Sequence, residues 1–515
     1  MRYGFVIDQR KCIGCHACTV ACKEENQVPL GVNRTWVKYI EKGTFPDTRR
    51  FFSVMRCNHC DNAPCVTICP TVALYRRPDG IVDFDGDRCI GCKSCMQACP
   101  YDALYIDPET QTAAKCHYCA HRIEVGLEPA CVIVCPVEAI VPGDLDDPGS
   151  RIARLVASQQ VAVRKPERGT QPKLFYLGAD EAALTPSMQE RGGRYLFAEA
   201  SHIPVPGGRN VAGATAPIGE AGVDLLRMAR TVYDVAHPER PWGWKVSTYL
   251  WTKAIAAGSL LTAIAGPAWS MPGAIPALIS LVFLALTVLL LTVDLKRPER
   301  FLYLFLKPNW RSWLVWGGFI LLAFGGLASL WLLGALWNAQ GLLLALAAPT
   351  VILALMAAGY SAFLFGQATG RDFWQSGLFL PHLIVSAVAA GNAALLLPAL
   401  WLYPADLDYF VPPPTWGLAA SLAVFLLLHL ALVLSELFAK HPTVDGARAA
   451  RFMRKGTMGR RLWVGVVLGG VALPLVLLGF AGQSWCLALA ALLALGGLWL
   501  WEDIWIRAGQ AVPLS

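Results

Sequence analysis

Residues 89–100 read CIGCKSCMQACP, a run in which four cysteines are separated by two, two and three residues and followed by Pro100. The two-residue gaps let one tight loop wrap three thiolates around a single face of a bound group. Pro100 removes a backbone N–H donor and fixes φ directly after the last cysteine. This spacing is a ligand pattern for a [4Fe–4S] cluster.

The run is one of four within the first 135 residues, and three of the four end in Cys-Pro. The cysteines of the four runs are Cys12, Cys15, Cys18 and Cys22; Cys57, Cys60, Cys65 and Cys69; Cys89, Cys92, Cys95 and Cys99; and Cys116, Cys119, Cys131 and Cys135. At four thiolates per cluster, these sixteen cysteines predict four [4Fe–4S] clusters.

Two other uses of cysteine compete with this interpretation. Zinc sites draw cysteine pairs from two hairpins, whereas these runs hold four cysteines each. Disulfides form in exported proteins, and residues 1–12, MRYGFVIDQRKC, lack the basic and then apolar pattern of an export signal. We therefore expect iron–sulfur clusters and no cleaved export signal.

Short apolar segments separate the runs, at residues 70–89 and 100–116. Each segment has the pattern of a short helix, a strand, a turn and a second strand. The sequence therefore predicts a tandem ferredoxin-like α+β iron–sulfur domain.

The four runs, with their widened gaps at 60–65 and 119–131, resemble the four-cluster electron-transfer subunit of the dimethyl-sulfoxide-reductase group of molybdenum enzymes. The resemblance covers residues 1–178 and includes GDLDDPGSRIARLVA at 143–157 and ERGTQPKLFYLG at 167–178. It implies the following ligand sets: Cys12, Cys15 and Cys18 with Cys135; Cys116, Cys119 and Cys131 with Cys22; Cys57, Cys60 and Cys65 with Cys99; and Cys89, Cys92 and Cys95 with Cys69.

The remainder of the sequence is strongly apolar. Charged residues make up only 16% of the whole, against about 25% in soluble domains, and the shortfall falls in residues 245–506. Eight apolar stretches there approach the ~20 residues that cross a bilayer: 246–268, 272–294, 312–335, 340–366, 379–403, 414–438, 462–482 and 484–506. Eight in succession argue against a buried soluble bundle and predict an all-α domain of eight transmembrane helices.

The net charge of +7 could suggest a nucleic-acid partner, but the basic residues lie mostly between apolar stretches. Loops on the N-terminal side of the predicted spans carry most of them, including Lys296, Arg297, Arg300, Lys307, Arg311 and Arg371 and the Lys and Arg residues of 440–461. The opposite loops carry none. The positive-inside rule therefore predicts a bacterial-type inner membrane, with the iron–sulfur domain and the C-terminus facing the cytoplasm and with no nucleic-acid partner.

Residues 179–222 are rich in Gly, Ala and Pro and predict a linker, and residues 223–245 have the pattern of an interfacial approach to a membrane. The predicted organisation is therefore an iron–sulfur domain at 1–178, a linker and interfacial segment at 179–244, and a membrane domain at 245–515.

The membrane half resembles the NrfD/polysulfide-reductase family of membrane anchors. The matching stretches are TVDLKRPERFLYLFLKPNWRSWLVWG at 292–317, LPHLIVSAVAAGNAAL at 380–395 and RAGQAVPLS at 507–515. The resemblance implies two four-helix bundles and a quinone site in the first bundle, near the cluster-domain side. The fusion departs from this family, whose anchor and cluster subunit are commonly separate polypeptides.

Ionisable residues inside the predicted spans are costly and often functional. We expect Lys253 and Asp294 to contact quinone, with lesser roles for Tyr249, Trp251 and Arg300. By contrast, Glu502 and Asp503 are expected to reach the headgroups from a helix end. A haem held by His382 and His429 is disfavoured, because their expected depths differ by roughly 9 Å at about 1.5 Å per residue.

A row of clusters moves single electrons, and quinol chemistry needs two electrons and two protons. We therefore expect the protein to pass electrons between quinone and a catalytic partner with a molybdenum or tungsten pterin, with sulfite oxidation as the first expectation. The sequence shows no nucleotide-binding fingerprint, so substrate catalysis is expected on the partner. The alternatives are a redox-driven proton-pumping module and a cluster-bearing scaffold of a larger respiratory complex.

Overall fold

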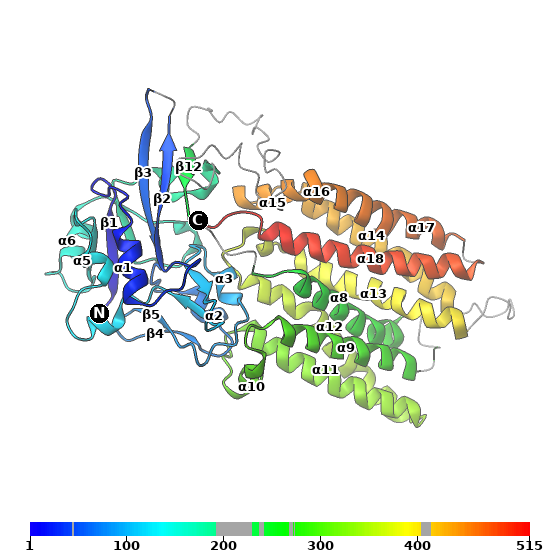
Figure 1. Cartoon of the computed structure of the whole chain (residues 1–515). Coiled ribbons are helices and arrows are strands. Elements are labelled where there is room, and N and C mark those ends of the chain that lie inside the picture. The colour runs from blue at the N-terminus through cyan, green and yellow to red at the C-terminus, as the bar shows by residue number, and fades with distance from the viewer. Residues whose placement is uncertain are drawn as a thin grey trace. The chain divides into compact units, whose positions relative to one another are not determined.

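The computed structural model describes residues 1–43, 46–191, 229–235, 241–266, 271, 273–402, 414–480 and 482–515. The protein divides into two compact units. The first is Met1–Glu239 with Pro513–Ser515, and the second is Arg240–Val512 (Figure 1). The predicted boundaries at 178 and 244 stay predictions, and the stretch at 202–222, rich in Gly, Ala and Pro, lies outside the described residues.

One sheet of the first unit is built around a strand that is buried on both faces. Its strand order is β8 (Ile140–Asp144), β1 (Tyr3–Asp8), β10 (Leu174–Leu177) and β9 (Val161–Ala162), with β1 antiparallel to β8 and parallel to β10. Phe5 and Ile7 pack into one hydrophobic cluster and Val6 into another, as the period-two alternation of a strand requires.

The second sheet has the order β11 (Gln189–Arg191), β12 (Ala229–Tyr233), β2 (Thr35–Lys42) and β3 (Arg49–Arg56). Figure 1 shows β2 and β3 as a long antiparallel hairpin. Here the structure differs from the predicted interfacial segment, because residues 229–233 form a strand paired with β2. Its Ala229 and Thr231 are buried while Arg230 reaches Glu41 at 2.8 Å.

Short helices and two-stranded hairpins complete the first unit. The helices are α1 (Ala17–Glu25), α2 (Pro64–Ile68), α3 (Ser94–Ala98), α4 (Ala120–Ile123), α5 (Ala130–Ile133), α6 (Arg151–Ser158) and α7 (Glu181–Leu184), with 3-10 turns at Pro166–Arg168 and Pro186–Met188. The hairpins are β4 (Leu74–Arg76) with β5 (Val82–Phe84), and β6 (Leu104–Ile106) with β7 (Ala113–Lys115). They lie where the sequence predicts two strands and a turn after the second and third cysteine runs.

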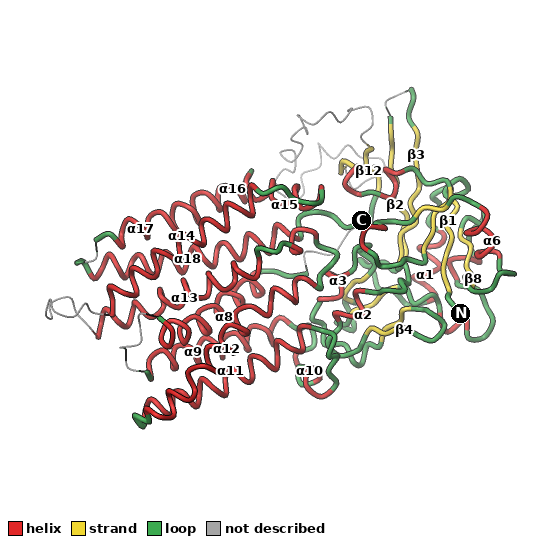
Figure 2. The backbone as a smooth tube through the Cα atoms, turned by 180° about the vertical axis from the view of Figure 1, so that it is seen from behind, coloured by secondary structure: helices red, strands yellow, loops and turns green. Residues whose placement is uncertain are grey.

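The second unit is helical, and its long helices run side by side in both views (Figures 1 and 2). Its elements are α8 (Trp244–Ala265), α9 (Ala274–Asp294), α10 (Tyr303–Leu306), α11 (Trp313–Leu336), α12 (Gln340–Gly366), α13 (Phe379–Leu402), α14 (Pro414–Phe438), α15 (Val444–Arg454), α16 (Gly456–Arg460), the π-helical segment η7 (Arg461–Ala472), α17 (Leu473–Leu478) and α18 (Ser484–Gly509), with 3-10 turns at Pro298–Arg300 and Asp372–Gln375.

Within the described residues, seven helices are long and apolar enough to cross a membrane. They are Ala274–Asp294, Trp313–Leu336, Gln340–Gly366, Phe379–Leu402, Thr415–Phe438, Gly456–Leu478 and Ser484–Gly509. The first predicted span forms α8 but is not among the seven. Polar side chains lower its hydropathy, and several of them lie buried among other helices: Ser247, Thr252, Lys253, Ser259 and Thr262. The predicted count of eight stays a prediction.

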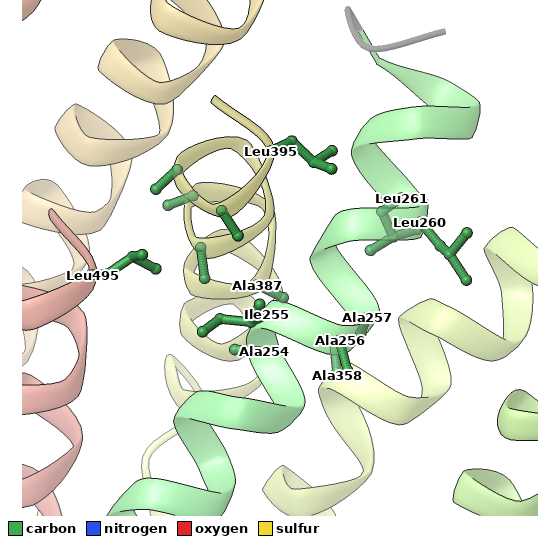
Figure 3. Packing of buried hydrophobic residues seen from close by; sticks show 14 of the residues in the cluster. Ala254, Ile255, Ala256, Ala257, Leu260, Leu261, Ala358, Ala387, Leu395 and Leu495 are labelled. Carbon is green, nitrogen blue, oxygen red and sulfur yellow. The ribbon is translucent and has the colours of Figure 1, made fainter. Parts of the chain in front are cut away.

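Helix α8 lies at the centre of the packing, against α9, α12, α13 and α18. Figure 3 shows its Ala254, Ile255 and Leu260 near side chains of α12, α13 and α18. Helices α8, α9, α11 and α12 pack on one another, as do α13, α14, α18 and the helix that contains η7. Helix α8 also packs closely on α13, which joins these two groups, so the two four-helix bundles stay a prediction.

Two glycines allow α8 and α13 to approach closely. A Cβ atom added to Gly258 would overlap the Ala387 carbonyl oxygen, and one added to Gly391 would overlap the backbone of Gly258. Small residues permit such backbone contact between helices in lipid. Gly258 and Gly391 therefore set the distance between these two helices.

Candidate iron–sulfur centres and a buried polar cluster

The four cysteine runs share one backbone feature. In each, the residue before the second cysteine has a positive φ: 71° at Gly14, 44° at His59, 67° at Gly91 and 63° at Tyr118. This left-handed conformation costs free energy in residues other than glycine, and such strain gathers at ligand clamps. In each run, this turn directs the first and second cysteine toward the same place.

The structure brings the predicted ligand sets together. One cavity is lined by Cys22, Cys116, Cys119 and Cys131, and another by Cys69, Cys89, Cys92 and Cys95. In the other two sets, Cys12 interacts electrostatically with Cys15 and Cys135, and Cys60 with Cys57 and Cys99. Each of these groups therefore holds cysteines of two runs, and the ligand sets themselves stay a prediction.

The surroundings of the thiols suit a bound cluster. Backbone N–H groups donate to Cys89 Sγ from Gly91 at 3.4 Å and from Ala113 at 3.3 Å, and to Cys135 Sγ from Ala139 at 3.2 Å. Hydrogen bonds to sulfur are a feature of iron–sulfur sites. Among the described residues, no three His, Cys, Asp or Glu side chains lie close enough to hold a single metal ion.

Burial keeps the thiols of Cys18 and Cys119 protonated when no iron is bound. It raises the pKa of Cys18 to about 11 and that of Cys119 to about 11, mainly by removing water from the thiolate. Iron binding at these sets must therefore displace protons.

The sets follow one another along a row. Helix α1 carries Cys18 of the first set and Cys22 of the second, and it packs on α5, which carries Cys131. Helices α2 and α3 pack together in the same way, and they carry Cys65 of the third set and Cys95 of the fourth. Cys116 of the second set interacts with Cys57 of the third, which links the two pairs.

In the helical unit, Lys253 is 1% exposed and lies on α8. Its Nζ donates to Ser361 Oγ and lies 4.4 Å from the centroid of the Tyr360 ring, both on α12. It also interacts electrostatically with Glu502 of α18. Three helices thus place an amine, a hydroxyl, a phenol and a carboxyl around one buried point.

The other predicted quinone residues lie nearer to helix ends. Asp294 is half-buried at the last residue of α9 and interacts electrostatically with Tyr249 of α8. Trp251 Nε1 donates to the Leu495 carbonyl at 2.9 Å, and Arg300 is half-buried in the turn after α9.

The expectation that Glu502 and Asp503 reach the headgroups is wrong. Glu502 is 4% exposed and Asp503 is 0% exposed. Asp503 accepts hydrogen bonds at 2.8 Å from Arg461 and Arg507. Neighbouring helices cover the turn of α18 that carries Asp503. The carboxylate is therefore buried, and the two arginine side chains extend to it.

The expected depth difference between His382 and His429 is also wrong. Their ring centroids are 4.7 Å apart, and Trp501 stacks on His382 at 4.9 Å. The ends of the two spans do not lie at one depth, because α14 extends past the start of α13 and so brings the two rings together. Ser386 Oγ lies 3.3 Å from His429 Nδ1.

Family models match both parts of the protein. A model described as polysulphide reductase, NrfD, matches residues 234–512. The chain therefore belongs to the NrfD family. A 4Fe-4S dicluster domain matches residues 48–145 and a 4Fe-4S binding domain matches residues 10–26. This NrfD protein is thus a fusion of a 4Fe-4S ferredoxin part with a multi-pass membrane part.

Curated relatives align with the iron–sulfur part of this NrfD protein. A tetrathionate reductase subunit of Salmonella typhimurium is 50% identical over 191 residues, which cover 36% of this chain and 76% of the relative. A polysulfide reductase polypeptide of Wolinella succinogenes is 45% identical over 179 residues, covering 34% and 93%. The arsenate respiratory reductase iron–sulfur subunit of a Shewanella strain is 37% identical over 227 residues, covering 34% and 96%.

Two residues of this NrfD protein that were not predicted as site residues, Arg56 and His59, lie beside the thiols. Both lie within or next to the second run, and each makes its contact with a cysteine of the fourth run. Their place in RCNHC was a signal, but the partner cysteines are more than 50 residues away along the sequence. Tyr360 and Ser361 were not predicted either, because they lie in an apolar stretch where no charge or motif marks them.

Proposed function

We propose that this protein carries electrons between membrane quinone and a catalytic partner through four [4Fe–4S] clusters. The observation that carries the proposal is the row of four cysteine sets on the same polypeptide as an NrfD membrane part. Each cluster, when bound, accepts or releases one electron. The protein's own residues hold the clusters in sequence and keep water away from the buried thiolates.

The order of the row follows from the elements that the sets share. The first and second sets share α1, the third and fourth share the packed helices α2 and α3, and the second and third meet at Cys116 and Cys57. The proposed path of an electron therefore runs through the four sets in this order. The terminal sets are those of Cys12 and Cys89.

Quinone chemistry is proposed at the buried cluster around Lys253. Exchange of two protons with a quinone requires groups that donate and accept them in a dry site. Lys253 supplies an ammonium donor, Glu502 a carboxyl group, and Ser361 a hydroxyl that positions the amine. Asp294 and Tyr249 form a second polar contact at the end of α9.

The partner is proposed to be a molybdenum or tungsten pterin enzyme. The relatives of the iron–sulfur part carry the names of tetrathionate, polysulfide and arsenate reductases, which supports such a partner and favours flow from quinol. Sulfite oxidation, the first expectation from the sequence, runs in the opposite direction. The two directions of electron flow are distinguished by purifying the protein from native membrane. The experiment identifies the co-purifying polypeptide, its metal and its substrate.

The proposed location is a bacterial-type inner membrane with the iron–sulfur part in the cytoplasm. The basic loops on one side of the predicted spans support it. A reporter fused after Ser515 and protease treatment of sealed, oriented vesicles test it, since cytoplasmic residues are cleaved only in inside-out vesicles.

A redox-driven proton-pumping module is a second candidate. The buried contact between His382 and His429, next to Ser386, favours it because these groups can pass a proton inside the helical unit. Acidification of the vesicle exterior or lumen during quinol oxidation supports pumping, and its absence with rapid turnover excludes it.

Changing Lys253 to Met is expected to lower quinone turnover at least about 100-fold while leaving the cluster signals unchanged, because it removes the buried proton donor and keeps the side-chain volume. Turnover is measured as quinol-dependent reduction of the clusters in purified full-length protein. Lys245→Met is the matched control, because Lys245 lies on the same helix and contacts only the Val293 carbonyl among the hydrogen bonds of the described residues. Equal turnover in both variants would remove Lys253 from the site.

A further inference from the structure

Arg56 is buried beside the second cysteine set without a carboxylate partner. It is 1% exposed, and no acidic side chain of the described residues forms an ion pair with it. Its Nη1 donates to Cys131 Sγ at 3.1 Å, and its guanidinium carbon lies 4.6 Å from the centroid of the Phe5 ring. A charge in such a place is costly unless a negative group balances it.

The rest of the guanidinium faces the same cavity. Arg56 lines the cavity formed by Cys22, Cys116, Cys119 and Cys131. Its Nε and Nη2 atoms are buried and have no hydrogen-bond partner among the described residues. Arg56 also interacts electrostatically with Cys116 and Cys18. The cation is therefore arranged for a negative group inside this set of thiolates.

His59 contributes a second donor from the same loop. Its Nδ1 accepts the backbone N–H of Val82 at 3.2 Å, so its ring proton lies on Nε2. Nε2 is 3.7 Å from Cys116 Sγ, within reach of a hydrogen bond to sulfur. The RCNHC loop thus provides two ligands to one set and two donors to its neighbour.

We propose that Arg56, assisted by His59, is the fixed counter-charge of the cluster held by Cys22, Cys116, Cys119 and Cys131 and raises the reduction potential of that cluster. The inference rests on the proposed cluster in this set. When the cluster gains one electron, no bond forms or breaks, and its net charge becomes more negative by one. A nearby cation stabilises that state more than the oxidised one, and hydrogen bonds to sulfur act in the same direction.

The test is a redox titration of purified full-length protein, followed by low-temperature paramagnetic resonance of the reduced clusters. In Arg56→Met, the ratio of reduced to oxidised cluster at a fixed potential is expected to fall at least about tenfold for one of the four signals, which corresponds to about 59 mV for a one-electron couple. Arg56→Lys keeps the charge and is expected to retain most of the wild-type ratio. His59→Phe is expected to give a smaller fall in the same signal.

Arg164→Met is the matched control. Arg164 is also 1% exposed in the first unit, but it donates to the backbone carbonyls of Leu184 and Leu514. It is expected to leave all midpoint potentials unchanged. If Arg56→Met loses the cluster, Arg56→Gln, which keeps an N–H donor without the charge, takes its place.

An unchanged midpoint in a cluster-bearing Arg56→Met or Arg56→Gln variant overturns the inference, and so does an equal shift in Arg164→Met. These outcomes leave the proposed function standing. If the wild-type protein itself shows no reduced-cluster signals and binds no iron, the proposed function fails, and the inference fails with it.

Discussion

Replacing Cys131 with alanine is expected to remove one cluster, about four iron atoms per molecule, and to lower quinol-linked electron transfer at least about 100-fold. Cys131 is buried and lines the cavity of the second set. That set lies between the sets of Cys12 and Cys57. Its loss therefore leaves a gap within the proposed electron path, whereas loss of a terminal set would remove only one end of it. Iron analysis and paramagnetic resonance of the purified full-length protein measure the change.

Cys486→Ala is the control for this experiment. Cys486 is buried on α18, outside the four runs, and its replacement is expected to leave iron content and electron transfer at wild-type levels. Full iron content in Cys131→Ala would show that the ligand set is assigned wrongly. Zinc in place of iron in the wild-type protein, prepared without oxygen, would contradict the cluster proposal itself.

Replacing Gly391 with alanine is expected to cost more free energy of unfolding than the ~1–3 kcal/mol usual for an overfilled core. The new Cβ meets backbone atoms of Gly258, which cannot rotate away as a side chain can. Since proteins have about 5–15 kcal/mol of total stability, we expect a large loss of folded protein in detergent extracts. Thermal unfolding followed by size-exclusion chromatography measures it.

Gly496→Ala provides the comparison. Gly496 lies on α18, where an added Cβ meets no atom of another described element within 4 Å. Alanine there is expected to be neutral or to stabilise the helix by up to about 1 kcal/mol. If Gly391→Ala unfolds at the same temperature as Gly496→Ala, the contact between α8 and α13 is looser than the structure shows.

The sequence predicts best what depends on neighbouring residues. The spacing within each cysteine run, the hairpins after the second and third runs, and seven of the apolar spans follow from local patterns of two to about twenty residues. Both parts of the fusion were recognised because their motifs are contiguous.

The sequence could not predict features that need a distant partner. Strand β12 forms because β2 offers it an edge almost 190 residues earlier in the sequence. Asp503 can be buried because Arg461, on another helix, donates a hydrogen bond to its carboxylate. Arg56 looks like an ordinary basic residue at the end of a strand until folding places Cys131 beside it.

Both units, Met1–Glu239 and Arg240–Val512, belong to one polypeptide. Synthesis therefore produces the iron–sulfur part and the membrane part in equal numbers. Dilution cannot separate the two parts, because the covalent connection fixes the effective concentration of each part near the other. A cell making this protein has no free pool of either part to exchange between complexes.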